Sequence, residues 1–259
     1  MRVAVGAGIT FVNGKGQKKP EIQLLHEELE KCGSRLMKYK SSFEIMGKDR
    51  NSYSKTDLEA TFMRMKEDHM LNGQLKPAYN VQVAVENYFI VHGYVSNDRT
   101  DYNTLIPILE KHQEAFGNMP EEVTADSGYC SEKNLLYLKE NRITSYIKLQ
   151  DHEQRKTRAY KEDIGKHYNM KREVSEDGHY YICHDGRELR HVRTETRKQD
   201  GFVQTVEVYG CADCGGCPHK AKCLYKYDAE KDAEKNKVMK VNERWEELRE
   251  ESHANIQSE

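Results

Sequence analysis

Val123-Thr124-Ala125-Asp126-Ser127-Gly128-Tyr129 is the stretch around which this chain is organised. Its apolar beginning predicts the end of a buried strand, and Ser-Gly predicts a turn. A helix is expected directly afterwards, because Ser131 is a suitable N-cap and Leu135, Leu136 and Leu138 supply an apolar face. An acid at the end of a strand, before a turn and a helix, lies where open α/β sheets bind ligands. Asp126 is therefore a candidate catalytic or metal-binding carboxylate; the alternative is that it only caps the turn.

The segments around this stretch predict a mixed α/β fold. Residues 81–85 and 88–95 alternate in a way that is typical of an antiparallel hairpin. Residues 101–111 predict a helix opened by Asp101, in which Pro107 fits only if the helix is kinked or begins late. A strand at 144–149 follows the helix at 131–141. A helix between two strands implies a parallel, right-handed crossover.

The N-terminal part predicts a short strand, a long helix and a basic loop. The strand is Ile9–Val12, closed by an Asn13-Gly14 turn. From Pro20, apolar residues recur in steps of three and four (Ile22, Leu25, Leu29, Cys32, Leu36 and Tyr39), which predicts an amphipathic packing helix. Residues 47–57 form a polar loop whose Lys48, Arg50 and Lys55 could contact phosphate oxygens, although most such loops are simply solvated.

A basic tract begins after residue 150. Arg155, Lys156, Arg158, Lys171 and Arg172 lie in it together with Tyr160 and Tyr168. Aromatic residues among basic ones suit stacking and phosphate contacts on nucleic acid, while the composition equally suits a solvated, disordered linker. Strands at 180–183, 189–192 and 202–209 predict a small antiparallel sheet. The spacing of Val238, Val241, Trp245 and Leu248 predicts a long helix within 228–259.

Five of the seven cysteines lie between Cys183 and Cys223. Zinc prefers four thiolate or imidazole ligands, and a Cys-x-x-Cys turn lets two sulfurs reach one ion. Cys183, Cys214, Cys217 and Cys223 are the predicted tetrad, with Cys211 spare and His219 as a substitute ligand. The alternatives are reduced cysteines in an insertion that folds without metal, and an iron–sulfur cluster supported only by the number of thiols.

Composition narrows the class of protein. Hydrophobic residues make up 37% and charged residues 32%, and 41 basic residues against 43 acidic ones give a net charge of −2. The chain therefore lacks the overall positive field of a free-standing nucleic-acid-binding domain, and any such binding must use local patches. No apolar run is long enough to span a membrane, and no signal peptide is present, so a cytoplasmic protein is expected.

Several segments resemble bacterial insertion-sequence transposases of the DDE class. They are Asn51–Asp57, Ala60–Lys66, Asn72–Gln82, Ala125–Tyr129 and the Cys-rich insertion. The resemblance implies an RNase H-like mixed sheet with flanking helices, interrupted by a small Cys-rich β insertion and followed by a long C-terminal helix. It implies a core at 1–149, a basic linker and insertion at 150–224, and the terminal helix at 225–259.

The same resemblance implies the chemistry. In the family, two Asp and one Glu bind two Mg²⁺ (or Mn²⁺) ions that promote attack on a phosphodiester. Asp126 corresponds to the second Asp. No acid precedes Thr10-Phe11-Val12, where the first Asp is expected, and no counterpart of the Glu motif occurs before Glu259. One carboxylate cannot retain two Mg²⁺ ions. A truncated transposase with little activity alone is therefore expected, with double-stranded DNA and a second copy of the chain as partners and no membrane.

Other interpretations stay open at this point. Asp57, Asp98, Asp101 or glutamates of the terminal helix could replace the missing ligands. The chain could instead be a non-catalytic DNA-binding or interaction remnant with a structural zinc site. A third interpretation is a chain that does not fold properly, because a sheet without its first strand has an unpaired edge.

Overall fold

The computed structural model describes residues 6, 8, 10–12, 16, 18–48, 50–65, 68, 70–176, 178–199 and 201–258. The chain forms two compact units. The first comprises residues 1–81 and 95–99, and the second comprises residues 82–94 and 100–259. The strand predicted at Ile9–Val12 is not found at Thr10, Phe11 and Val12, which are neither helix nor strand; Ile9 and the Asn13-Gly14 turn lie outside the described residues. The predicted boundaries at 149/150 and 224/225 stay a prediction.

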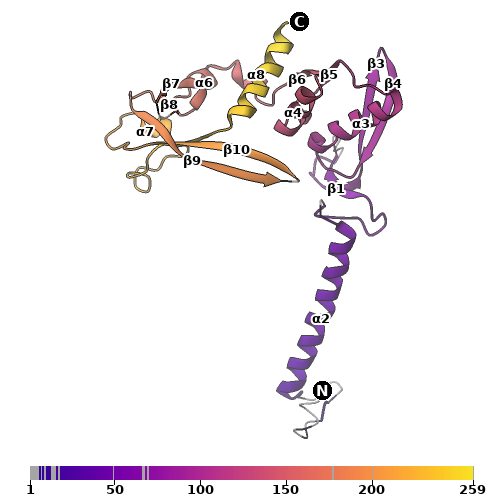
Figure 1. Cartoon of the computed structure of the whole chain (residues 1–259). Coiled ribbons are helices and arrows are strands. Elements are labelled where there is room, and N and C mark those ends of the chain that lie inside the picture. The colour runs from indigo at the N-terminus through magenta and orange to yellow at the C-terminus, as the bar shows by residue number, and fades with distance from the viewer. Residues whose placement is uncertain are drawn as a thin grey trace. The chain divides into compact units, whose positions relative to one another are not determined.

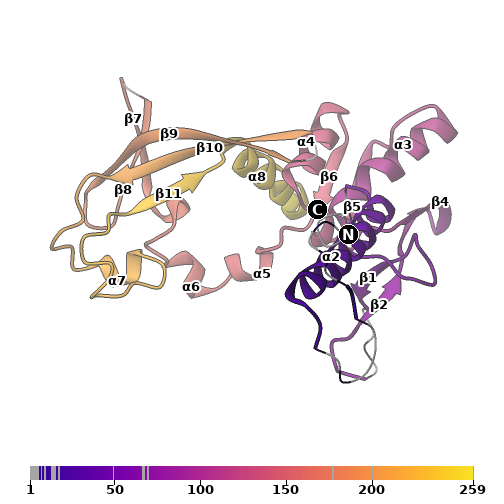
Figure 2. The ribbon, with the colours of Figure 1, turned by 90° about the horizontal axis from the view of Figure 1, so that it is seen from below.

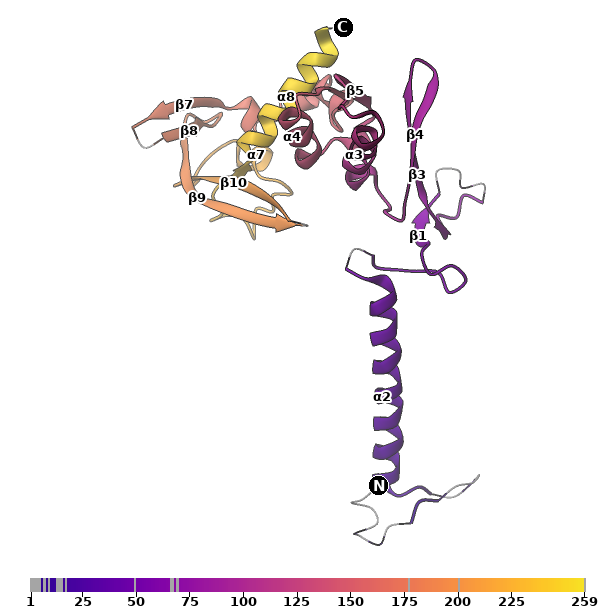
Figure 3. The ribbon, with the colours of Figure 1, turned by 45° about the vertical axis from the view of Figure 1, so that its right-hand side comes forward.

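The first unit contains α2 (Glu21–Met46), which is a single uninterrupted helix (Figure 3). It confirms the helix predicted from Pro20 and ends at Gly47, whose φ of 68° favours glycine. The described residues of the 47–57 loop contain no helix or strand, as predicted. Two antiparallel strands that the sequence analysis did not identify follow, β1 (Thr61–Arg64) and β2 (Leu75–Ala78).

The predicted hairpin is present as β3 (Asn80–Glu86) and β4 (Phe89–Ser96). Asn87 and Tyr88 form its two-residue turn with φ values of 47° and 70°. Positive φ at both central positions matches the right-handed twist of the flanking strands. β3 and β4 form a sheet of their own, and β5 and β6 form another (Figure 1).

The second unit places the Asp126 stretch at the end of a parallel strand pair. Its elements are the 3₁₀ turn Asp101–Asn103, α3 (Leu105–Phe116), β5 (Glu122–Ala125), the 3₁₀ turn Ser127–Tyr129, α4 (Glu132–Glu140) and β6 (Thr144–Ile147). β5 and β6 pair in parallel, with Val123 opposite Ser145, which confirms the predicted strand–helix–strand order. α3 begins after Thr104, so Pro107 lies in the first turn, where its missing N–H breaks no helical hydrogen bond.

A buried cluster joins these elements. It contains Leu105, Ile108, Leu109, Leu135, Leu138, Ile147 and Leu248. Leu248 comes from the C-terminal helix α8 (Glu243–Ser258). Ser252 fixes that helix to β6, because its hydroxyl donates to Ile147 O at 3.0 Å and accepts from Ile147 N at 3.3 Å. The carboxyl end of β5 is thus held on a packed α/β layer.

The remainder of the second unit is an antiparallel sheet in the order β11-β10-β9-β8-β7 (Figure 2). Its strands are β7 (Lys171–Ser175), β8 (Gly178–Ile182), β9 (Glu188–Gln199), β10 (Phe202–Cys211) and β11 (Val238–Val241). The short helices α5 (His152–Arg155) and α6 (Arg158–Lys161) lie between β6 and β7, before the sheet begins, and α7 (Lys220–Cys223) lies between β10 and β11. The predicted small sheet is confirmed, with the strand predicted at 189–192 extending to Gln199.

Two expectations about this part were wrong. The terminal helix does not include Val238 and Val241, because Met239 and Val241 alternate with exposed residues in a strand that pairs with β10. The helix begins only at Glu243 and has 16 residues. The tract after residue 150 is not a structureless linker, since α5, α6 and β7 all lie within residues 150–175. No helix among the described residues is long and apolar enough to cross a membrane.

Candidate functional site

Asp126 caps the turn at the end of β5. Its Oδ1 accepts a hydrogen bond from Gly128 N at 2.8 Å, so Asp126 does cap the turn, and its role as a ligand stays a prediction. The Asp126 side chain is nevertheless exposed, and a carboxylate has further lone pairs after one such bond. Capping fixes the orientation of this carboxylate and leaves it free to meet a ligand.

Asp101 lies beside Asp126 in this unit. A Cβ placed on Gly128 would stand 2.9 Å from both Asp101 Oδ2 and Asp126 Oδ1, so the two carboxylates face a common space over this glycine. Contacts that short force the neighbours to move, so no larger residue fits at position 128 without displacing a carboxylate. Of the three aspartates considered as substitute ligands, Asp101 is the one that the structure brings to Asp126 within one unit. The other two belong to the first unit, where Asp57 accepts from Tyr79 and Asp98 from Ser96.

Two side chains hold Asp101 in place. Gln82 Nε2 donates to Asp101 Oδ1 at 2.9 Å, and the Tyr129 hydroxyl donates to Gln82 Oε1. Burial, and then the charges of Asp101 and Asp126, raise the pKa of Tyr129 to about 12, so its hydroxyl stays protonated and donates. The sequence analysis assigned Gln82 and Tyr129 no role, although both lie in the quoted motifs.

The donor chemistry here suits one hard cation. Two neighbouring carboxylates fit an ion such as Mg²⁺, which is usually held by one or two carboxylates and keeps several waters. They do not fit a pair of ions. No group of three or more His, Cys, Asp or Glu side chains that could hold a metal ion occurs in the described part of the chain.

The predicted zinc ligands lie in one module. Burial raises the pKa of the Cys223 thiol, the Lys237 charge opposes this change, and the negative charges that Cys183, Cys214 and Cys217 would carry raise the pKa further. These four thiols are thus neighbours, although the described side chains do not converge on one centre. The alternative ligand His219 packs its ring edge-on against His184, with centroids 4.7 Å apart.

The backbone of this Cys-rich module is held together by polar contacts. Arg187 Nη1 donates to Asp213 O at 2.8 Å and to Gly215 O at 3.0 Å, which joins the Cys183 turn to the Cys214 turn. Lys237 N donates to Cys214 Sγ at 3.3 Å, a contact that would stabilise a thiolate. Cys211 is buried and donates to Asp213 O at 3.2 Å, and burial raises its pKa to about 11. Cys211 also lies beside Cys214 and Cys183, whose charges raise its pKa after burial does, so its exclusion from the zinc ligands stays a prediction.

The basic residues predicted to contact DNA mostly have partners within the chain. The five residues of the tract that were predicted to contact DNA pair with acids: Arg155 with Glu250, Lys156 with Glu153, Arg158 with Glu162, Lys171 with Glu173 and Arg172 with Glu243. Arg50 donates to four carbonyls, those of Ile45, Met46, Leu58 and Glu59, and so ties the end of α2 to the following turn. Lys48 and Lys55 are exposed. A DNA contact for any of these residues stays a prediction.

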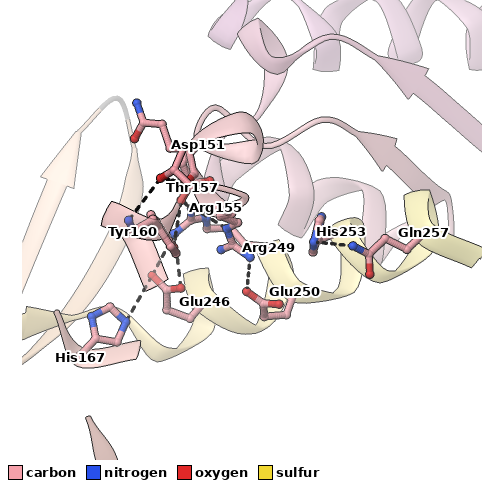
Figure 4. A network of polar contacts seen from close by, with 11 residues as sticks. Asp151, Arg155, Thr157, Tyr160, His167, Glu246, Arg249, Glu250, His253 and Gln257 are labelled. Carbon is pink, nitrogen blue, oxygen red and sulfur yellow. Dashed lines mark hydrogen bonds and ion pairs between the residues drawn. The ribbon is translucent and has the colours of Figure 1, made fainter. Parts of the chain in front are cut away.

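A polar network connects α8 to the segment before β7 (Figure 4). Arg249 Nη2 forms an ion pair with Asp151 Oδ2 at 2.5 Å, and Arg155 Nη1 forms one with Glu250 Oε1 at 2.7 Å. His167 lies 3.8 Å from Glu246, and burial lowers the pKa of this imidazole although the Glu246 carboxylate opposes the change. Arg249 and Lys166 lower it further. The network therefore holds a half-buried histidine whose neutral form is favoured.

Acidification is expected to destabilise the second unit through His167. Because its pKa is lower folded than unfolded, the unfolded chain binds more protons below about pH 6.5. His167 should therefore leave the free energy of unfolding unchanged above that pH and lower it as the pH drops. The full loss is about 1.4 kcal/mol for each pH unit by which folding lowers the pKa of His167. Urea denaturation at several pH values between 7.5 and 5.5 measures this. His167→Gln should flatten the profile, whereas the exposed His179→Gln should not; equal profiles for both would contradict the assignment.

The comparisons with known proteins give one match. Residues 182–259 match the family model of the transposase DDE domain, a range that contains the Cys-rich module, β9 to β11 and α8. No curated protein and no solved structure matches the chain. The match supports the resemblance to DDE-class transposases with a stretch of sequence that lies beyond Asp126.

Proposed function

We propose that this chain, which matches the transposase DDE domain over residues 182–259, acts in DNA transposition with Asp126 and Asp101 as ligands of one divalent cation, Mg²⁺ or Mn²⁺. The observation that supports this most directly is the common space that the two carboxylates face over Gly128 at the end of β5. When bound, the cation would polarise a phosphoryl oxygen. The chain would bind double-stranded DNA and would act in the cytoplasm.

The chain's own residues prepare this site. Asp126 is oriented by the backbone N–H of Gly128, and Asp101 by the Gln82 amide. Because Tyr129 keeps its proton, it can only donate to Gln82 and adds no charge. For these 259 residues alone we propose little or no strand transfer, because they supply no counterpart of the family's first Asp or final Glu.

Mn²⁺ binding measured by electron paramagnetic resonance tests the cation site directly. Asp126→Asn and Asp101→Asn should each weaken Mn²⁺ binding on the order of 10- to 100-fold, a range seen even when an outer partner of a metal ligand is lost. Asp98→Asn is the matched control, because Asp98 is close in sequence and already accepts from Ser96. Unchanged binding in Asp126→Asn would refute the proposal, as would equal losses in all three variants.

A second candidate function is a non-catalytic DNA-binding or interaction role with a structural zinc ion. The clustering of Cys183, Cys214, Cys217 and Cys223 in a module bridged by Arg187 favours it. The chemistry of four thiols fits zinc, which would hold the module's turns together. Salt-dependent DNA binding without Mn²⁺ binding would support this function over the first.

A further inference from the structure

α2 carries an apolar seam with the repeat of a coiled coil. We define the seam as Ile22, Leu25, Leu29, Cys32, Leu36, Tyr39, Phe43 and Met46. The steps between these residues alternate strictly between three and four along the whole 26-residue helix. An average step of 3.5 keeps a seam facing one partner helix along its length, and more than three heptads of it are typical of a coiled coil rather than of a helix lying on a globular core.

Six of the eight seam residues are exposed, and Ile22 and Met46 at its two ends are partly buried. Leu29 is 71% exposed, Leu36 is 66% exposed and Phe43 is 67% exposed, and the buried residue of α2 is Gln23. Packing of an apolar face normally supplies most of the stability of a helix, and a helix of this length spans about 39 Å. A continuous apolar surface of that length on a monomer marks an interaction site.

The charges along α2 select the partner. Residues 21–33 contain four glutamates and one lysine, whereas residues 34–46 contain Arg35, Lys38, Lys40 and a single glutamate. A parallel pair of α2 helices would place acid beside acid and base beside base. An antiparallel pair places the acidic half of one helix along the basic half of the other, within the distance at which charges still attract in physiological salt. A second copy of this chain therefore offers both the matching seam and the opposite charges.

We propose that two copies of this chain associate through α2 as an antiparallel two-stranded coiled coil. With the two helices overlapping end to end, Ile22 lies opposite Met46 of the second copy and Cys32 opposite its Leu36. The pairing does not rest on the proposed DNA chemistry. A monomeric chain that binds Mn²⁺ would overturn the pairing alone, and a dimer that does not bind Mn²⁺ would overturn the cation site alone.

Sedimentation equilibrium of the full chain tests the association. The wild type should sediment at twice its mass of 30.2 kDa. Leu36→Glu should weaken the dimer about 100-fold or more, because it would bury an unpaired carboxylate in the seam. Met37→Glu is the matched control: Met37 is adjacent and 70% exposed but lies outside the seam, so the dimer should persist. A monomeric wild type, or equal behaviour of the two variants, would overturn the proposal.

Oxidative cross-linking tests whether the two α2 helices are antiparallel, and it does so without a substitution that disrupts the dimer. Cys32 is the exposed one among the seven cysteines, all of which are described. Under copper–phenanthroline, which oxidises two thiols to a disulfide, the wild type should not link Cys32 to Cys32. Leu36→Cys should give a covalent dimer on a non-reducing gel, in which peptide mass spectrometry should find Cys32 joined to the new thiol. A Cys32–Cys32 link in the wild type, or no link in the variant, would overturn the antiparallel register.

Discussion

Replacing Glu132 with alanine is expected to lower the free energy of unfolding by about 3 kcal/mol, because its carboxylate is a buried junction of three elements. Glu132 is the first residue of α4 and is 3% exposed. Its Oε1 accepts from Arg244 Nε of α8 at 2.7 Å. Its Oε2 accepts from Gln204 Nε2 of β10 at 2.9 Å and from Asn242 Nδ2 at 2.6 Å.

The expected loss in the free energy of unfolding depends on the groups that lose their partner when Glu132 is replaced. Removing one partner of a buried ion pair costs about 3–5 kcal/mol, since the other charge and donors are left without a partner. Arg244 is 43% exposed at its side chain and also donates to Val203 O, so it can turn partly to water. The expected loss therefore lies at the lower end of that range.

Urea denaturation followed by tryptophan fluorescence measures this loss in the free energy of unfolding, with a probe next to the Glu132 contacts. Trp245 is the single tryptophan of the chain and follows Arg244 at the start of α8. Glu140→Ala, at the exposed end of the same helix, should change stability by less than about 0.5 kcal/mol. In a double-mutant cycle, Arg244→Ala should cost much less once Glu132 is alanine. Additive losses, or equal effects at positions 132 and 140, would show that Glu132 is not a junction.

The local part of the fold could be predicted from sequence because its signals are local. The apolar run before Asp126, the Ser131 cap and the leucines of α4 all act within a few residues, and β5, α4 and β6 are found as expected. The error at Val238 and Val241 has the same origin. A step of three is compatible with a helix, but pairing with β10 makes this segment a strand.

The candidate site could be predicted only in part, because its remaining members meet through space. Asp101 reads as a helix cap in sequence, and only the fold brings its carboxylate over Gly128 beside Asp126. No sequence pattern near Glu132 predicts its contacts with Gln204 and Arg244, which lie far away along the chain. The basic tract shows its charges in sequence but not the acids of α8 that pair with Arg155 and Arg172.

Removing zinc is expected to unfold the Cys-rich module, if Cys183, Cys214, Cys217 and Cys223 hold the ion as we propose. Metal binding supplies folding free energy directly in small zinc-binding units, about 10–16 kcal/mol in zinc-finger peptides. Elemental analysis of the purified chain should give one zinc per chain. A strong chelator should remove it and abolish the amide protection of the turns around Cys214 and Cys217 in hydrogen exchange.

Three serine variants separate the proposed ligands from the other thiols. Cys217→Ser should release zinc and weaken its binding, because a hydroxyl is a much poorer ligand than a thiolate. Cys211→Ser should retain zinc, since Cys211 is the spare thiol that donates to Asp213 O. Cys32→Ser, on the exposed face of α2, should retain it fully. A chain purified without zinc would refute the site. Zinc loss in Cys211→Ser with retention in Cys217→Ser would keep the metal but reassign its ligands, because the thiols of this module lie close enough for a different set of four to bind.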